Sequence, residues 1–561
     1  MRISALVLLL VVSLGGIFPV SGQDTLKNSA SPGTDQPDIS PKVSLPMPLD
    51  ELVDRVIDRE RDEMQLLRPL KPIVETYMQI QKEDKTLGLV PGSDFYFLGQ
   101  ASFAKQPALK SLLSHTKTKT IWYSYHPVGF LTMIFVDAKY FDKKHYQFRY
   151  AGQAFLGEFR CYMFDVSPRP KTRSYKFRGR IWVEASNFSI IRINGLFDRG
   201  HTLSLTAFEE KENFHFDSWR TNTQPGVWLP SYTYCQEIGR DRWFQGPVLK
   251  AQTRLWGYHM RREIREDEFT DLKIETAMPV ADEQESHDRS PLEALRLWRR
   301  EAENNTLDAF EADGLLAPPG PVDKILDQIV TNIVVTNKLD DQVDLRCRVL
   351  LTSSFEMFSV GNTIILSRGL IDVIPDENVM ALLVAEEVAD AMVPKQYQDQ
   401  FAFSDEVRIS PTQIMKKLSF QDDEEETADN LQKAMQLINN SPYAGKLAKA
   451  DLFFAQLNSQ SKELKQLISP RLGNQVTGLA RTWNKTNALH PDDKDQIVAL
   501  PMGSRIKLDA WDDHIELLKA PRQTILSARE KMPFEIVPLY PYATKYPETA
   551  SNQAAKLATA Q

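Results

Sequence analysis

Residues 361–390 read GNTIILSRGLIDVIPDENVMALLVAEEVAD, and this stretch decides how the C-terminal half of the chain folds. The short apolar run from Thr363 to Leu366 predicts a strand, and a turn follows it. From Glu377 onward the apolar residues recur at helical spacing, so we expect an amphipathic helix over 377–392. The residues that this helix is expected to bury are Met380, Leu383, Val384 and Val388.

Three carboxylates gather near the end of the expected helix. Glu386 and Asp390 are four residues apart, so they share one face of the helix, and Glu387 lies beside Glu386. Without a metal, these three carboxylates and Glu425 would crowd negative charges together, so we expect part of the cluster to be protonated or solvated.

The stretch resembles the active-site segment of the HtpX/BepA-like zinc metallopeptidases, the Ste-type gluzincins. In that family an edge strand ends in an -RGL- turn, matched here by Arg368-Gly369-Leu370, and the next helix carries H-E-x-x-H. The five motif positions here read Glu386-Glu387-Val388-Ala389-Asp390. The catalytic Glu of the family is therefore present as Glu387, and both histidine positions hold carboxylates.

The resemblance also implies the remaining parts of the site. The family takes a third ligand from a later helix as Glu-x-x-x-Asp, which Glu425 to Asp429 match. Glu386, Asp390 and Glu425 then stand at the metal-ligand positions, Glu387 at the general-base position, and Asp429 at the position that supports the ligands. Residues 422–426 (DDEEE) equally fit a solvated helix start, and this interpretation removes Glu425 from any site.

The chemistry of this donor set argues against a working zinc peptidase. Catalytic zinc is normally held by ligands that include imidazole. Two carboxylates in place of neutral ligands make the metal less able to acidify its bound water. We therefore expect a pseudopeptidase without a cofactor, which binds or scaffolds a peptide added along the strand Thr363–Leu366. The alternatives are a site that holds zinc or another divalent cation without proteolysis, and an active metalloendopeptidase with carboxylate ligands.

In residues 94–258 the apolar residues recur with a period of two, which is typical of strands, in place of the helical spacing. Nine runs in this region are rich in aromatic and β-branched residues and are separated by turn signals; one of them is 129–138, GFLTMIFVDA. Nine strands with little helix predict one large curved antiparallel sheet or an open barrel. Ahead of them, 50–81 has helical spacing, and Pro69 and Pro72 are expected to kink or break that helix.

Part of this β region resembles the LolA-like outer-membrane lipoprotein-sorting domains. Arg178 to Glu184 (RGRIWVE) followed by Ile190 to Ile193 is similar to their central hairpin, and Trp219-Arg220 with Val227 to Pro230 is similar to their next strands. That family folds a half-barrel around an apolar cavity for acyl chains. The resemblance implies a second function, a periplasmic carrier or sensor of lipids or lipoproteins. Ordinary packing of the two faces of a sheet also accounts for the pattern.

The N-terminus has the pattern of a secretory signal, with Arg2, an apolar run from Ala5 to Leu14, and small residues at 20–22. We expect cleavage after Gly22 and export to the periplasm or the extracellular space; the alternative is an uncleaved N-terminal anchor. The net charge of −8 gives no electrostatic case for nucleic acid. The expected partners are an envelope protein or peptide segment, a lipid or a lipoprotein, with membrane contact at most peripheral.

The expected fold class is multidomain α+β, an antiparallel LolA-like half-barrel followed by a mostly helical gluzincin-type domain with a small sheet. Of the three cysteines, Cys161 and Cys235 share the β region, where they either pair as a disulfide or pack as small apolar residues. The expected boundaries are a signal peptide over 1–22, a disordered linker over 23–45, an N-terminal helix and β domain over 46–275, a linker and helix over 276–320, a metallopeptidase-like domain over 321–530, and a tail over 531–561.

Overall fold

The structure is a computed structural model, and its described residues begin at Met47. The expected signal peptide, the linker 23–45 and the tail 531–561 lie outside the described residues. None of the described helices has the length and apolar character needed to cross a membrane. The described residues are 47–84, 88–104, 107–113, 119–120, 123–124, 127–156, 159–169, 176–198, 214–224, 226–237, 249–258, 303–339, 344–392, 424–468, 472–473, 475–486, 506–508 and 515–517.

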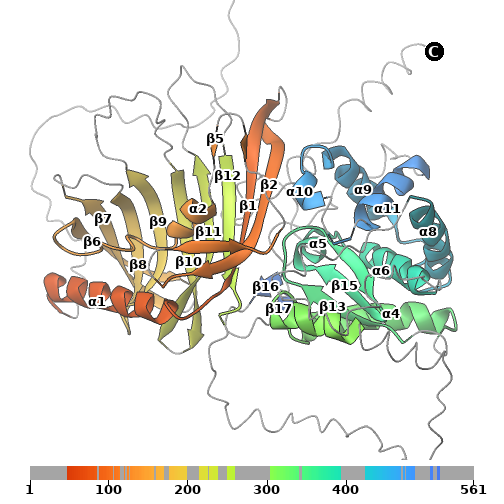
Figure 1. Ribbon diagram of the computed structural model, residues 1–561, viewed down its shortest axis with the longest axis horizontal. Helices are drawn as coiled ribbons and strands as arrows, with labels where there is room; N and C mark the ends of the chain where they lie inside the picture. The colour runs from red at the N-terminus through yellow and green to blue at the C-terminus, as the bar shows by residue number, and fades with distance from the viewer. Residues whose placement is uncertain are drawn as a thin grey trace, which may run out of the picture. The chain divides into compact units, whose positions relative to one another are not determined.

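One large antiparallel sheet dominates the N-terminal half (Figure 1). Its ten strands lie in the order β3-β2-β1-β12-β11-β10-β9-β8-β7-β6, so the expected antiparallel architecture is confirmed. The strands are β1 (Ile73–Asp84), β2 (Gly88–Ser102), β3 (Ala108–Ser111), β6 (Tyr146–Leu156), β7 (Phe159–Pro168), β8 (Lys176–Glu184), β9 (Ile190–Asp198), β10 (Phe214–Gln224), β11 (Val227–Glu237) and β12 (Leu249–Trp256). A separate pair joins β4 (Lys119–Thr120) to β5 (Tyr123–Ser124).

Two expectations for this half are wrong. The helix expected over 50–81 is α1 (Leu49–Leu67) only, and β1 replaces its second part, because the two prolines end the helix and β1 is buried on both faces, so its residues do not alternate. The strand expected over 129–138 is the short helix α2 (Pro127–Thr132) followed by turns. A short apolar run fits a buried helix as well as a buried strand.

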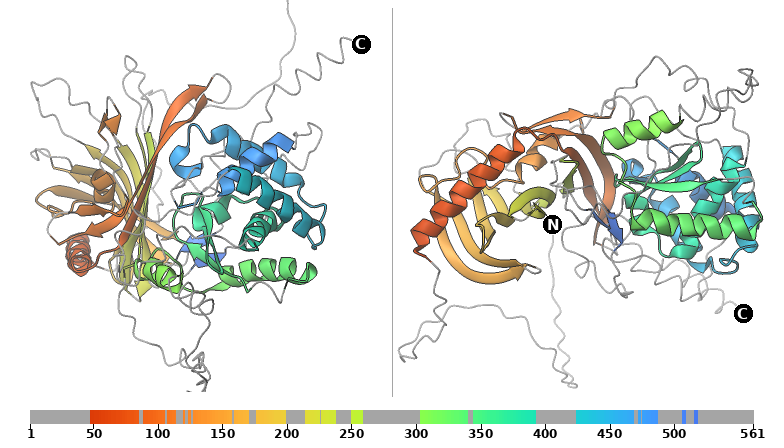
Figure 2. Two further views of the ribbon diagram at one scale, coloured as in Figure 1. Left: turned by 45° about the vertical axis from the view of Figure 1, so that its right-hand side comes forward. Right: turned by 90° about the horizontal axis from the view of Figure 1, so that it is seen from below.

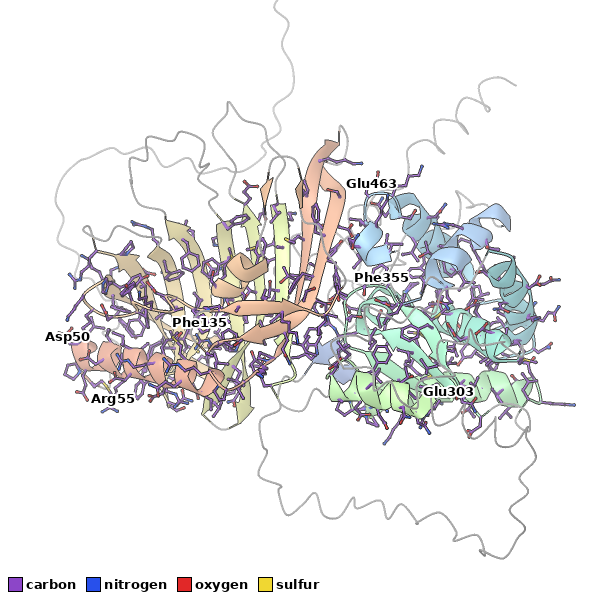
Figure 3. The ribbon with its side chains drawn as sticks, in the orientation of Figure 1. Asp50, Arg55, Phe135, Glu303, Phe355 and Glu463 are labelled. Atoms are coloured by element: carbon purple, nitrogen blue, oxygen red, sulfur yellow. The ribbon has the colours of Figure 1, made fainter. Side chains whose placement is uncertain are left out.

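Helix α1 packs along one face of the sheet (Figures 1 and 2). Its apolar stripe is buried, and two glutamates, Glu60 and Glu63, are buried in the same helix. Both meet Arg220 of β10, whose Nη1 donates to Glu60 Oε2 and to Glu63 Oε2 at 2.6 Å each. A buried ion triad therefore fixes α1 to the strand. Nearby, Phe135, labelled in Figure 3, packs edge-to-face on Phe103 with ring centroids 5.9 Å apart.

The C-terminal half is mostly helical and has a three-stranded sheet, as expected. A helical stretch over 303–312 precedes it. The helices are α4 (Pro321–Thr336), α5 (Arg368–Val373), α6 (Glu377–Ala391), α8 (Glu424–Asn439), α9 (Ala448–Gln460), α10 (Lys465–Ile468) and α11 (Gln475–Thr486). The strands are β13 (Arg346–Leu350), β14 (Met357–Val360) and β15 (Thr363–Ser367), with a further pair of β16 (Ile506–Leu508) and β17 (Ile515–Leu517).

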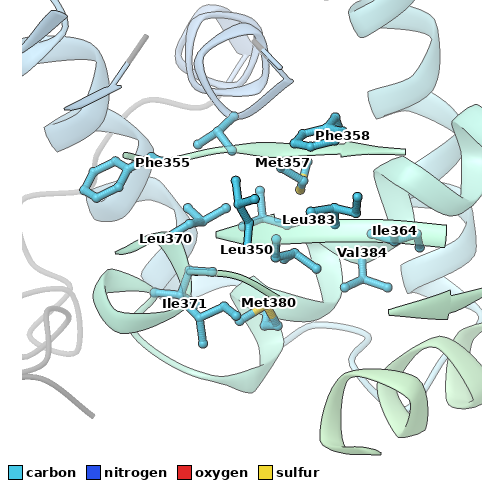
Figure 4. Close-up of a cluster of buried hydrophobic side chains, with 14 of the residues drawn as sticks. Leu350, Phe355, Met357, Phe358, Ile364, Leu370, Ile371, Met380, Leu383 and Val384 are labelled. Carbon is cyan, nitrogen blue, oxygen red and sulfur yellow. The ribbon is translucent and has the colours of Figure 1, made fainter. Parts of the chain in front are cut away.

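The four residues that α6 was expected to bury are buried, but the expectation of an amphipathic helix is wrong, because every residue from Val379 to Asp390 is buried. Met380, Leu383, Val384 and Val388 are all buried. Figure 4 shows Leu383 and Val384 beside Ile364 of β15, in the cluster that joins the helix to the small sheet. Asp376 starts the helix as its N-cap, with its side chain accepting from the backbone N–H groups of residues 378 and 379.

The strand Thr363–Leu366 is not an edge strand, which corrects the expectation drawn from the peptidase resemblance. It forms most of β15, which lies between β13, its parallel neighbour, and β14, its antiparallel neighbour. All five residues of β15 are buried. Both edges of β15 are already hydrogen-bonded, so a peptide cannot be added along it.

The outer strands of this small sheet also carry other segments of the chain. Against β13, the N–H of Ala317 donates to Val349 O at 2.8 Å, and the N–H of Leu351 donates to Leu315 O at 2.8 Å. Against β14, Gly473 approaches so closely that a Cβ there would lie 2.3 Å from Met357 O. Strand addition to this sheet is thus opposed at both sides.

Buried carboxylates join the large sheet to the helical half. Glu75 of β1 accepts from the backbone N–H and the hydroxyl of Ser353, both at 2.6 Å. Asp94 of β2 accepts from the N–H groups of Gln466 and Leu467 at 3.0 and 2.9 Å. Side chains of the large sheet and of the helical half share one apolar cluster; they include Tyr77, Tyr96, Trp256, Leu315 and Phe355.

The cysteines are free and buried, so Cys161 and Cys235 do not form a disulfide. Burial raises the pKa of the Cys161 thiol to about 11. Each of the two therefore packs as a small apolar residue.

Candidate functional site

The end of α6 holds three buried carboxylates in the positions that the sequence predicted. Glu386 and Glu387 are 0% exposed and Asp390 is 3% exposed. The helix that carries them is built from strong helix formers, mainly Ala, Leu and Glu, and is buried along most of its length. Burying a carboxylate is costly unless hydrogen-bond donors surround it, so the neighbours of these groups decide what the cluster does.

Glu387 points toward the small sheet. The hydroxyl of Ser359, on β14, donates a hydrogen bond to Glu387 Oε2. Cys347 of β13 is close enough to sense the same charge: burial raises the pKa of its thiol well above the usual value, and the charges of Asp327, Asp323 and Glu387 raise it further. The family's general-base position is thus turned into the interior between α6 and the sheet.

Asp390 points toward α8. Asn430 Nδ2 donates to Asp390 Oδ1 at 3.1 Å, and both side chains are buried. Glu386 shares the Asp390 face of α6 by its four-residue spacing. The two residues at the family's histidine positions therefore lie on the side of α6 that meets α8, which is the helix expected to supply the third ligand.

The two residues predicted on α8 are placed less favourably. Glu425 lies in the first turn of α8, and its side chain is outside what the structure describes. Asp429 is exposed, whereas Asn430, one residue later, is buried and bonds Asp390. Matching letters to the family motif selected Asp429. The helical phase identifies Asn430 instead, because Thr427, Asn430, Leu431 and Ala434 form one buried stripe.

The glycine of the R-G-L motif has a steric reason. Gly369 lies in α5 against the backbone of the loop before β14, and a Cβ there would lie 2.0 Å from Ser353 O. Its N–H donates to Thr352 O at 3.0 Å. Only glycine allows this approach, which fixes the end of β15 relative to the loop that contacts Glu75.

The arrangement does not suit catalytic zinc. Two carboxylates without an imidazole are a poor donor set for that metal. Among the residues whose side chains are described, no three His, Cys, Asp or Glu residues are grouped so that they could hold a metal ion. A general base must also reach the proton that it removes, either directly or through one water. Glu387 is fully buried, and its Oε2 accepts a hydrogen bond from the Ser359 hydroxyl of the neighbouring strand.

Comparisons with known proteins add little. No family model matches the chain, and no curated protein matches it. A crystal structure of a DUF1329 family protein from Desulfovibrio piger ATCC 29098 is similar in part, at 12% sequence identity, with 40% of this chain and 97% of that chain covered and a TM-score of 0.19. A TM-score this low does not establish a shared fold.

Proposed function

We propose that this chain is an exported cell-envelope protein whose C-terminal half is an inactive relative of the HtpX/BepA-like peptidases with a binding or scaffolding role. One observation carries the proposal. The three motif carboxylates are buried, and Ser359 and Asn430 bond two of them. A catalytic zinc site keeps one position open for water or substrate. A sealed cluster of this kind holds α6, β14 and α8 together.

The proposal also constrains how a partner binds. Because β15 is the central strand of its sheet, an envelope protein or peptide must be recognised on another surface. A proteolytic alternative requires Glu386, Asp390 and Glu425 to meet at one metal and Glu387 to face its water, but Glu387 bonds Ser359 instead.

Restoring the histidines tests this proposal. The double variant Glu386→His/Asp390→His recreates H-E-x-x-H on α6, and the matched control Glu386→Gln/Asp390→Asn removes the same charges without adding imidazole. We expect no zinc in the wild type or the control after dialysis, and stoichiometric zinc in the histidine variant, measured by elemental mass spectrometry. Imidazole supplies the ligands that the carboxylates lack.

Two outcomes contradict the proposal. Stoichiometric zinc in the wild type that is lost in Glu386→Ala supports the active metallopeptidase instead. A folded histidine variant that binds no zinc removes the relationship to the peptidase scaffold. Circular dichroism of each variant separates that result from misfolding.

A lipid or lipoprotein carrier is the second candidate, and the helix α1 favours it. This helix covers one face of the large sheet and is anchored there by the Glu60–Arg220–Glu63 triad, while the rest of its buried stripe is apolar. Such a helix is able to cover or release an apolar surface. A fluorescent acyl probe that binds the full chain, and binds more tightly to Arg220→Met, supports a carrier; no binding to either protein excludes it.

A further inference from the structure

A hollow of about 740 Å³ lies on the sheet face opposite α1, over β6 to β10. Side chains alternate between the two faces of a strand, and this alternation shows which face of the sheet carries the hollow. On β10, Phe216 and Arg220 point toward α1, whereas His215 points the other way and lines the hollow. On β8 the buried Ile181 alternates with Arg180 and Trp182, both of which line the hollow. Neither proposed function uses this face.

A row of charged residues crosses the strands at the hollow. Arg149 on β6 lies opposite Asp165 on β7, which lies opposite Arg180 on β8. Arg149 Nη2 donates to Asp165 Oδ2 at 2.7 Å, and Arg180 Nε donates to Asp165 Oδ1 at 2.8 Å. The hydrogen bond from Arg180 holds the pKa of Asp165 below its usual value. One carboxylate is thus shared between two guanidinium groups, and the trio carries an excess positive charge.

The two arginines keep donors for a further ligand. A guanidinium group has five N–H donors, and the bonds to Asp165 use one from each. The Arg149 side chain is 81% exposed and that of Arg180 is 42% exposed, so both side chains are accessible to a ligand from solvent. Arg178 lines the same hollow. With three arginines and one aspartate, the described residues of the lining carry a net charge of +2 if His215 is neutral, in a chain whose net charge is −8.

A second row of side chains, with Arg192 stacked between Trp182 and Trp219, holds one wall of the hollow rigid. The guanidinium carbon of Arg192 lies 4.5 Å from the ring centroid of Trp182 and 4.6 Å from that of Trp219. Arg192 Nε also donates to Asp217 Oδ1 at 2.8 Å. Trp182, which lines the hollow, is therefore fixed by a cation–π stack across three strands. A rigid wall lowers the ordering cost of binding.

We propose that this hollow binds a small molecule with an anionic phosphate group, which Arg149 and Arg180 hold beside Trp182. A phosphate monoester carries nearly two negative charges at neutral pH, which matches the excess charge of the lining. The planar guanidinium forks suit its oxygens because they form paired, charge-assisted hydrogen bonds. The phosphate belongs either to a soluble phosphate ester or to a lipid headgroup.

Binding to the full chain tests the proposal and separates the two sources. The soluble probe is glycerol 3-phosphate, measured by titration calorimetry, and the lipid probe is a vesicle that contains phosphatidic acid, compared with one of phosphatidylcholine alone. Binding of glycerol 3-phosphate supports a soluble ester. Binding only to the phosphatidic acid vesicles supports a headgroup. Failure of both probes overturns the proposal, whatever the zinc experiment shows.

Removing a positive charge and removing a negative charge from the hollow are expected to change the affinity for phosphate in opposite directions. We expect Arg180→Gln to weaken binding about tenfold or more, since a charge-assisted bond is lost. Asp165→Asn is expected to tighten binding, because Asp165 is the one acidic residue among the described residues that line the hollow. Arg61→Gln, on the exposed side of α1, is the control and leaves affinity unchanged. A folded Arg180→Gln variant that binds like the wild type, or an Asp165→Asn variant that binds more weakly, overturns the proposal.

Discussion

At the residue scale, the contrast between Asp429 and Asn430 shows what a motif match leaves out. The sequence places both on α8, and the family pattern selects Asp429. The helix phase, which packing sets, buries Asn430 against Asp390 and leaves Asp429 exposed. The positions of Glu386, Glu387 and Asp390 on α6 were predictable because their spacing is local. Their burial was not, because Ser359 and Asn430 come from elements far away in the sequence.

Replacing Asn430 with Ala is expected to lower the free energy of unfolding by about 1–3 kcal/mol, since Asp390 then stays buried without this donor. Asp429→Ala, the neighbouring control, is expected to change it by no more than about 0.5 kcal/mol. Urea unfolding of the two variants measures the difference. Equal losses would show that Asp429 supports the site from an exposed position.

At the element scale, the sequence identifies elements with a clear period and fails where burial removes the period. The strands β6 to β12 were predicted from their aromatic and β-branched residues and the turn signals between them, although burial along β12 does not alternate. Strand β1 is buried on both faces, so its apolar residues continued the helical pattern of α1 across Pro69 and Pro72. The hairpin of β14 and β15 is local in the sequence, but the central place of β15 also depends on its parallel pairing with β13, which the apolar pattern of the strand does not specify.

The docking of α1 depends on pH through Glu63. Burial raises the pKa of this carboxyl to about 7 from an ordinary 4.5, and the negative charge of Glu60 also raises it, while Arg220 acts in the opposite direction. The folded state therefore holds the proton more tightly than the unfolded state. The contribution of Glu63 to stability is present below pH 4.5 and is lost as the pH rises toward about 7.

Glu63→Gln is expected to reduce this loss, because the amide stays neutral and still accepts from Arg220. The difference in unfolding free energy between pH 4.5 and pH 7 should shrink by roughly 1–3 kcal/mol, as expected from about 1.4 kcal/mol per pKa unit. Glu51→Gln, on the exposed side of the same helix, should leave the difference unchanged. An unchanged pH dependence in Glu63→Gln contradicts the assignment.

At the scale of the whole molecule, buried carboxylates make the large sheet and the helical half one structure. Glu75 accepts from the hydroxyl of Tyr96 at 2.6 Å as well as from Ser353, so it joins β1, β2 and the loop before β14. Glu463, labelled in Figure 3, makes a similar connection near the surface, where its Oε1 lies 3.1 Å from Lys82 Nζ. Burial makes the first connection strong and leaves the second weak.

Calorimetry compares the two connections. The wild type is expected to unfold in one transition. Glu75→Ala should lower stability by about 3 kcal/mol or more, because it leaves the buried N–H of Ser353 without its acceptor. Lys82→Ala should cost about 1 kcal/mol or less. Two well-separated transitions in the wild type would show that the halves are independent.

The same connections determine how late in synthesis the large sheet can complete its contacts with the helical half. Glu75 and Ser353 are 278 residues apart, and Asp94 and Leu467 are 373 residues apart. At a synthesis rate of about 5–20 residues per second, roughly 15–60 s pass between the synthesis of Glu75 and that of Ser353. Until then Tyr77, Tyr96 and the two carboxylates have no partner from the helical half. We therefore expect the apolar side chains of the nascent sheet that face the helical half to stay exposed, and prone to aggregation, until these distant segments are synthesised.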